Sequence, residues 1–238
     1  MEDIVTEAMR YSLLAGGKRL RCALALEFCL ALGGNKEDVL PFACALEMVH
    51  AYSLIHDDLP CMDDDDMRRG KPSCHIAFGE ANALLAGDGL LTKAFEVMAQ
   101  QSKIPPERTV LAVGVLAQAI GHHGMIGGQR MDLQNEGKEV GIEVIEQTNR
   151  LKTGALIIAA AQLGCIAAGA DSKMTELAKK YAEQIGLAFQ ITDDILDCTS
   201  SAEVLGKPIG SDAENHKTTY RSEEHTSELQ SPIHLVCR

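Results

Sequence analysis

The residues best suited to chemistry lie in the stretch 50–72, HAYSLIHDDLPCMDDDDMRRGKP. Asp57 and Asp58 stand at the expected end of an apolar helix, and Asp63 returns after a four-residue loop broken by Pro60. This loop lets the three carboxylates converge, which is costly for like charges unless a cation lies among them. The next acidic side chains are interpreted as a solvated face: Asp64, Asp65 and Asp66.

A second acidic group lies in QITDDILD, residues 190–197, inside an apolar helical pattern. Asp193 and Asp197 are four residues apart and share one helix face. A solvated loop could explain the first group, but it cannot explain carboxylates within an apolar helix. Oxygen ligands without His or Cys favour Mg²⁺, which completes its shell with water and substrate phosphates. An EF-hand is disfavoured because neither run has the central Gly and terminal Glu spacing.

Cationic residues flank the first acidic group. Arg68 and Arg69 follow it directly, and Lys18 and Arg21 follow the pair Gly16-Gly17. Such side chains bind phosphate oxygens by charge-assisted hydrogen bonds, so we expect a phosphate or diphosphate substrate. His50 precedes Asp57 by about two helical turns and shares its helix face. A lone His in a helix is more often structural, and both interpretations of His50 stay open.

The elements that must position these residues are expected to be helices. Apolar residues have helical spacing from Ile4 to Leu13, and the stretch 20–32 is apolar nearly all round. Another helix should run from about residue 38, with Pro41 in its first turn, until Pro60 ends it. Further helices are expected at 78–101, 106–122, 141–169 and 173–198. No alternating strand pattern is evident, so we predict an all-α fold.

Composition limits the possible partners and compartment. The net charge of −12 is unsuited to nucleic acid, and 46% hydrophobic residues over 238 positions fit a globular chain. Eight cysteines form no CxxC pair, as in a reduced cytoplasmic protein. No run approaches about 18 uninterrupted apolar residues, and no signal peptide is evident, so we expect a cytoplasmic protein without stable membrane insertion.

Six motifs together resemble the trans-isoprenyl diphosphate synthases, the polyprenyl synthetase family, and in particular the bacterial farnesyl diphosphate synthases. They are GGKRLR (16–21), the stretch 50–72, GGQRMDL (127–133), LKTGAL (151–156), FQITDDILD (189–197) and GKPIGSD (206–212). The resemblance implies an isoprenoid synthase type helical bundle around a central cavity. It also implies a homodimer and three Mg²⁺ ions per active site.

The same resemblance assigns roles by position. Metal ligands would be Asp57, Asp58, Asp63, Asp193 and Asp197. The allylic diphosphate would be bound by Arg68, Lys152, Lys207 and Lys217. Isopentenyl diphosphate would be bound by Lys18, Arg21, His50 and Arg69. Thr153 and Gln190 would lie near the reacting carbons, as substrate-binding and catalytic groups. The catalytic set is completed by Asp57, Asp58, Asp63, Arg68, Lys152 and Asp193.

The implied reaction joins isopentenyl diphosphate head to tail to dimethylallyl or geranyl diphosphate and releases diphosphate. Tyr52, with Ser53, would form the floor of the chain-elongation pocket, since it lies one turn before Asp57. A bulky floor and the two extra residues of the Asp-Asp-x4-Asp motif favour a C15 product, farnesyl diphosphate. Geranylgeranyl diphosphate synthase, with a C20 product, remains the alternative.

Two further kinds of protein would share part of this pattern. A class I terpene cyclase should lack the acidic group at Asp193–Asp197 and the second set of cations. An inactive partner subunit should have lost one of the two acidic groups. Both acidic groups and the second set of cations are present, which favours an active synthase.

The resemblance also sets the expected domain limits. We expect a synthase domain at 1–220, truncated at both ends relative to the family. Residues 221–238, RSEEHTSELQSPIHLVCR, are polar and aperiodic. They are expected to be a disordered or spurious tail.

Overall fold

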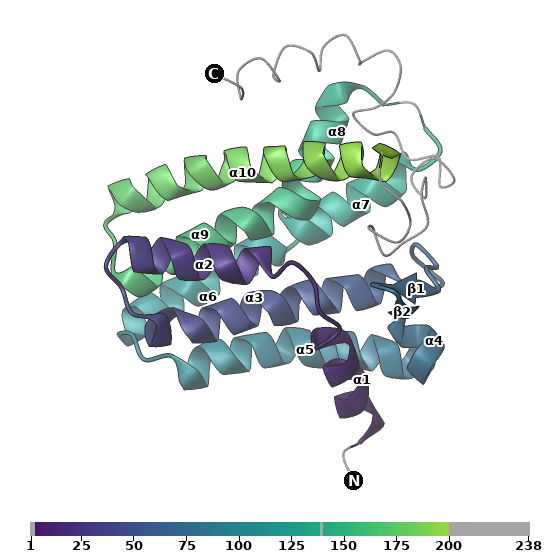
Figure 1. Ribbon diagram of the computed structural model, residues 1–238, viewed down its shortest axis with the longest axis horizontal. Coiled ribbons are helices and arrows are strands. Elements are labelled where there is room, and N and C mark those ends of the chain that lie inside the picture. The colour runs from purple at the N-terminus through teal and green to yellow at the C-terminus, as the bar shows by residue number, and fades with distance from the viewer. Residues whose placement is uncertain (1–2, 139, 200–238) are drawn as a thin grey trace.

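The computed structural model describes residues 3–138 and 140–199, with side chains up to residue 192. Figure 1 shows helices stacked side by side, with α10 above α9 and α2, and α3 and α5 below them. The elements are α1 (Ile4–Leu13), α2 (Leu20–Ala31), α3 (Lys36–Asp57), β1 (Met67–Arg68), β2 (Lys71–Pro72), α4 (Cys74–Phe78), α5 (Glu80–Gln101), α6 (Pro106–Ile120), α7 (Met125–Asn135), α8 (Ile142–Asn149), the π-helix η1 (Arg150–Gly154), α9 (Ala155–Ala168) and α10 (Ser172–Thr199). The all-α prediction is confirmed.

Several local features differ from the sequence expectation. Helices α4 and α7 were not predicted. The charged loop contains a two-stranded antiparallel hairpin, β1 and β2, which pairs Met67 with Pro72 and Arg68 with Lys71. Helix α3 begins at Lys36, two residues earlier than predicted, so Pro41 lies inside the helix instead of in its first turn. A proline this near the N-terminus removes one backbone hydrogen bond.

The interior is built from helices that are apolar on several faces. Helix α3 buries Phe42, Leu46 and Val49 completely. Helix α9 packs against α2 because Gly164 has no side chain: a Cβ there would lie 2.8 Å from the Cβ of Phe28. These contacts hold α3, which carries the first acidic group, at the centre of the bundle.

Three helical stretches are long and apolar enough to cross a membrane, judged by length and composition alone. They are Lys36–Asp57, Pro106–Asn135 and Ile142–Ala168. This corrects the expectation that no segment would have that composition, because a count of uninterrupted apolar residues ignores helices with a few polar interruptions. Within the protein, 56%, 33% and 61% of these apolar windows are buried, respectively. Interior helices of a bundle have this composition because several of their faces contact other helices.

Candidate active site

Asp57 and Asp63 come together at the C-terminal end of α3. Asp57 is the last residue of the helix, and the loop folds back so that the Asp63 amide donates to the Asp57 carbonyl at 2.9 Å. The return is tight because the Asp64 amide also donates to the Leu59 carbonyl, at 3.2 Å, with Asp64 in the left-handed region at φ 51°. The predicted convergence of these two positions is therefore present.

The environment of the Asp57 carboxylate suits a bound cation. Its pKa is raised to about 6, mainly by burial and also by repulsion from Asp63. The positive charge of Lys152 acts in the opposite direction and lowers this pKa. A divalent cation between the two carboxylates would relieve both the burial and the repulsion. Among the residues with described side chains, no group of three acidic, His or Cys residues forms a complete metal site. Asp193 and Asp197 lie in α10, but their side chains fall outside that described part.

Asp58 has a different environment from its neighbour. It is 2% exposed, and Arg68 donates to its Oδ1 from Nε at 2.9 Å and again from Nη2. The same Nη2 donates to Asp65 Oδ2 at 2.8 Å, so Asp65 is an ion-pair partner and the interpretation of it as purely solvated is wrong. Asp64 and Asp66 are exposed, as expected. Arg68 therefore competes with any cation for Asp58, whose role as a Mg²⁺ ligand stays a prediction.

Lys152 approaches this site from the opposite side of the bundle. It lies in the π-helix η1, a widened turn of the kind often found at functional sites. Its Nζ donates to Asp132 Oδ2 on α7 at 2.6 Å. Gly128 permits this contact, because a Cβ there would overlap the Lys152 backbone nitrogen. Asp132 was not among the residues predicted from the sequence, although its place in the motif GGQRMDL was an available signal.

A cationic cluster forms beside the acidic residues, and we define it as Lys18, Arg21, His50 and Arg69. Arg69 donates to the Gly16 carbonyl, and its Nη2 lies 3.5 Å from His50 Nε2. The pKa of His50 lies well below its usual value because of burial, and then because of the charges of Arg21 and Arg69. These effects favour the neutral imidazole, so the positive charge of the cluster comes from Lys18, Arg21 and Arg69. Lys18 Nζ lies 5.4 Å from the centroid of the Phe189 ring of α10.

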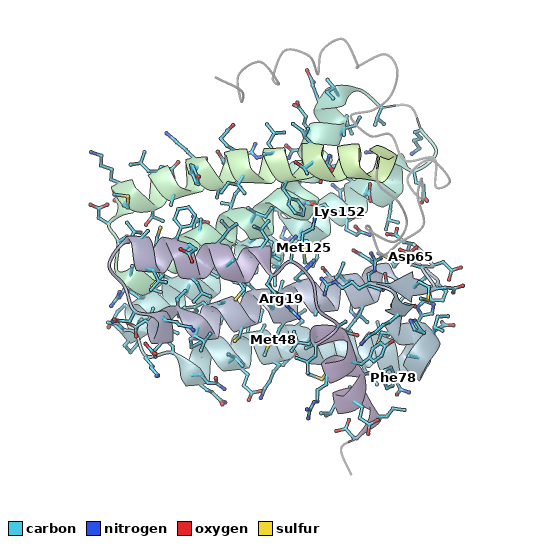
Figure 2. The ribbon with its side chains drawn as sticks, viewed as in Figure 1. Arg19, Met48, Asp65, Phe78, Met125 and Lys152 are labelled. Carbon is cyan, nitrogen blue, oxygen red and sulfur yellow. The ribbon has the colours of Figure 1, made fainter. Side chains whose placement is uncertain are left out.

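Four separate segments supply the cluster: the α1–α2 connection, α2, α3 and the hairpin. Figure 2 shows Arg19 between the start of α2 and α3, with Asp65 in the charged loop and Lys152 across from it on η1. The structure thus brings together Arg21, His50 and Arg69, which stand up to 48 positions apart in the sequence, with Lys18 on the same segment as Arg21. The cluster lies beside the carboxylates and can bind an anionic group directly through charge-assisted hydrogen bonds.

Tyr52 lies inside the bundle near Asp57, and its role as a pocket floor stays a prediction. It is 6% exposed, and its hydroxyl is buried without a hydrogen-bond partner among the described residues. Burial, followed by the charge of Asp57, raises its pKa to about 12. Ser53 instead donates to the His50 carbonyl at 3.0 Å, so its hydroxyl is satisfied within α3.

The structure describes the surroundings of the remaining predicted residues less fully. Thr153 lies next to Lys152 in η1. Gln190 lines a cavity of about 320 Å³ between α8, η1, α9 and α10, whose lining includes Gly154 and Gly186 but none of the first acidic group. Lys207 and Lys217, and the predicted boundary at 220, lie outside the described residues.

A helical bundle in which convergent carboxylates lie beside clustered cations suits a protein that binds an anionic substrate together with a cation. A family model described as polyprenyl synthetase matches residues 2–228, and the chain belongs to that family. It is therefore a prenyltransferase. It is 49% identical to a farnesyl diphosphate synthase of Geobacillus stearothermophilus over 216 residues, which cover 90% of this chain and 73% of the relative.

A second relative and a solved structure agree with this assignment. The chain is 47% identical to geranylgeranyl pyrophosphate synthase 7 of Arabidopsis thaliana, covering 97% of this chain and 69% of that protein. It also matches the crystal structure of a geranyltransferase from Helicobacter pylori complexed with magnesium and isoprenyl diphosphate, with a TM-score of 0.87 and 32% identity. That match covers 97% of this chain and 79% of the other.

Proposed function

We propose that the protein condenses isopentenyl diphosphate with dimethylallyl or geranyl diphosphate, head to tail, to give farnesyl diphosphate and diphosphate. The observation that carries this proposal is the convergence of Asp57 and Asp63 beside the cationic cluster. The convergent carboxylates suit a metal-bound diphosphate, and the cationic cluster suits a second diphosphate that binds without metal. A terpene cyclase needs only the site for the metal-bound diphosphate.

Different sets of residues bind the two substrates. Asp57 and Asp63, with Asp193 and Asp197 from α10, would hold the Mg²⁺ ions, of which we propose three, and through them the allylic diphosphate. Mg²⁺ when bound supplies Lewis-acid stabilisation of the departing diphosphate. Arg68 and Lys152, with Lys207 and Lys217, bind the same group directly. The solved relative that contains magnesium and isoprenyl diphosphate supports the use of Mg²⁺ and of an isoprenyl diphosphate substrate.

The protein's part in the reaction is orientation and charge stabilisation. Lys152 and Arg68 stabilise negative charge as the allylic C1–O bond breaks. Lys18, Arg21, His50 and Arg69 hold isopentenyl diphosphate so that its terminal alkene carbon forms the new bond to that C1. The proton lost from C2 passes to the released diphosphate. Oxygens of Thr153 and Gln190 stabilise the allylic cation, and no protein nucleophile is needed.

The product length is proposed from the pocket floor. Tyr52 is bulky and buried, which favours a C15 product. Relatives of comparable identity include both farnesyl and geranylgeranyl synthases, so a C20 product is the alternative. An inactive partner subunit, in contrast, would bind the substrates without turnover.

We further propose a cytoplasmic homodimer that binds neither nucleic acid nor membrane stably. Exposed apolar side chains on neighbouring helices α5 and α6, including Leu84, Leu85, Val110 and Leu111, offer a surface for a second copy. Sedimentation of the purified chain tests the assembly.

The reaction is tested with labelled isopentenyl diphosphate, geranyl diphosphate and Mg²⁺, with and without chelator, followed by chain-length analysis. A Mg²⁺-dependent C15 product supports the proposal, and a C20 product supports a geranylgeranyl diphosphate synthase. Binding of both substrates without turnover, with or without an added active synthase, would support an inactive partner subunit.

A further inference from the structure

The segment 16–21, which carries Lys18 and Arg21, has an unusual backbone. Gly16 and Gly17 have φ of 89° and 121°, and Arg19 has φ 51°. Glycine adopts such angles freely, but a non-glycine residue in the left-handed region is strained. Strain of this kind persists only where surrounding contacts hold the backbone in place.

The side chain of Arg19 supplies such contacts. Its Nη1 donates to Glu47 Oε2 at 2.6 Å, and its Nη2 donates to the Leu13 carbonyl at 2.8 Å. One guanidinium thereby joins the end of α1, the residue before α2 and the middle of α3. The Glu47 side chain is only 11% exposed, so the pair is shielded from solvent on the α3 side.

Glu47 is also placed to act on the cationic cluster. It precedes His50 by three residues on α3, so both side chains lie on one helix face. The charges of Arg19, Arg21, Arg68 and Arg69 all lower the pKa of His50, which shows how many cations gather there. By binding Arg19, Glu47 ties the segment that carries Lys18 and Arg21 to the helix that carries His50.

The opposite side of the segment is held by the hairpin. Arg69 donates to the Gly16 carbonyl, and a Cβ at Gly17 would lie 2.8 Å from the Arg69 guanidinium carbon. Arg69 belongs to the site that we assign to isopentenyl diphosphate, whereas Arg19 is engaged in its ion pair. The two arginines therefore have different tasks on one short segment.

We propose that Arg19 and Glu47 are positioning residues: their ion pair holds segment 16–21 in the conformation that presents Lys18 and Arg21 to isopentenyl diphosphate. This inference rests on the proposed function. It adds two residues that touch neither substrate but set the affinity of one substrate selectively. The allylic site, built on Asp57, Asp63 and Lys152, is independent of this pair.

The test uses Glu47→Gln, with Glu37→Gln, an exposed position on the same helix, as the matched control. Isopentenyl diphosphate is titrated calorimetrically into each protein, and the steady-state constants are measured for both substrates. We expect Glu47→Gln to weaken binding and to raise KM for isopentenyl diphosphate about tenfold, as loss of a charge-assisted hydrogen bond predicts. The kcat at saturation and KM for geranyl diphosphate should stay within about threefold.

Arg19→Met and the double variant Arg19→Met/Glu47→Gln complete a double-mutant cycle. If the two residues act as a pair, the double variant is no weaker than either single one, and Arg19→Lys recovers part of the affinity. Hydrogen exchange at residues 16–21 should rise in Glu47→Gln and not in Glu37→Gln, and thermal melts establish that each variant is folded.

The outcomes separate this inference from the proposed function. If the wild type binds and converts isopentenyl diphosphate while Glu47→Gln matches it, the positioning role is wrong and the proposed function stands. Equal losses in kcat and in both KM values would also overturn the inference, since they indicate general damage. If the wild type itself neither binds nor converts isopentenyl diphosphate, the proposed function fails and the inference falls with it.

Discussion

Arg68 donates two hydrogen bonds to a single carboxylate oxygen of Asp58, which is 2% exposed, across the charged loop. The pKa of Asp58 is nevertheless raised, because burial outweighs the hydrogen bond and charge of Arg68. The cost of burying the two charges therefore offsets much of the attraction between them, and the ion pair adds little net stability. It fixes the hairpin to the end of α3, and so it positions Arg69, the residue after Arg68, beside His50.

Asp58→Ala should destabilise the protein, because it leaves the guanidinium of Arg68 without its main partner. We expect a loss of about 3 kcal/mol in the free energy of unfolding, as is usual when one member of a buried ion pair is removed. Urea denaturation measures this change. Asp66→Ala, in the same loop but exposed, should stay within about 0.5 kcal/mol. Equal effects of the two substitutions would contradict the structural role of the pair.

The stability of the metal-free protein should fall as pH rises through the range set by Asp57. Its pKa is about 6 in the folded state, above the ordinary value near 4, so the folded state binds the extra proton between these values. This contribution is therefore present below about pH 4 and lost above about pH 6. Asp57→Asn removes the penalty and should raise the free energy of unfolding at pH 7.5 by up to about 3 kcal/mol.

Urea titrations in chelator at pH 4.5, 6 and 7.5 measure this effect, and Asp64→Asn, at an exposed position, is the control. With excess Mg²⁺ the gain of Asp57→Asn should disappear, because the wild-type carboxylate then has a cation to bind. An Asp57→Asn protein that is less stable than the wild type in chelator at pH 7.5 would show that burial of the ionised Asp57 carboxylate does not destabilise the folded state.

Gly128→Ala should disrupt the site through the backbone. Its new Cβ would overlap the Lys152 backbone nitrogen and force α7 away from η1. We expect a loss of stability of about 2 kcal/mol or more, as for other overpacked sites, together with a large loss of kcat. Gly114→Ala in α6 is the control, because its Cβ would meet nothing within 4 Å. That change should stabilise the protein by about 0.5 to 1 kcal/mol, since alanine is the better helix former. Wild-type activity in Gly128→Ala would show that the close contact is not needed.

The sequence predicted most of the helices, though not α4 and α7, and the meeting of the acidic and cationic residues, because these depend on local patterns and motif spacing. It did not predict which carboxylate would pair with which cation. Asp58 was predicted as a metal ligand and Asp65 as part of a solvated face, and only the hairpin geometry showed that both engage Arg68. The π-helix at Lys152 was also missed, because a widened turn has no signature in hydrophobic periodicity. Arg19 stood in a recognised motif, but its partner Glu47 is 28 residues away and on another helix.

Tyr52→Ala should lengthen the product. Tyr52 is 6% exposed and close enough to Asp57 for that carboxylate to raise its pKa, so its ring fills space one turn below the acidic site. Removing the ring opens room for a further isoprene unit, and we expect the main product to shift from C15 towards C20 or longer. The loss of a buried aromatic ring should also lower stability by about 3 kcal/mol. Mass spectrometry of the dephosphorylated products measures the shift, and Tyr181→Ala, at an exposed site on α10, is the control. An unchanged C15 product from folded Tyr52→Ala would remove Tyr52 from the pocket floor, and a C20 product from the wild type would show that a bulky residue here does not limit the chain to C15.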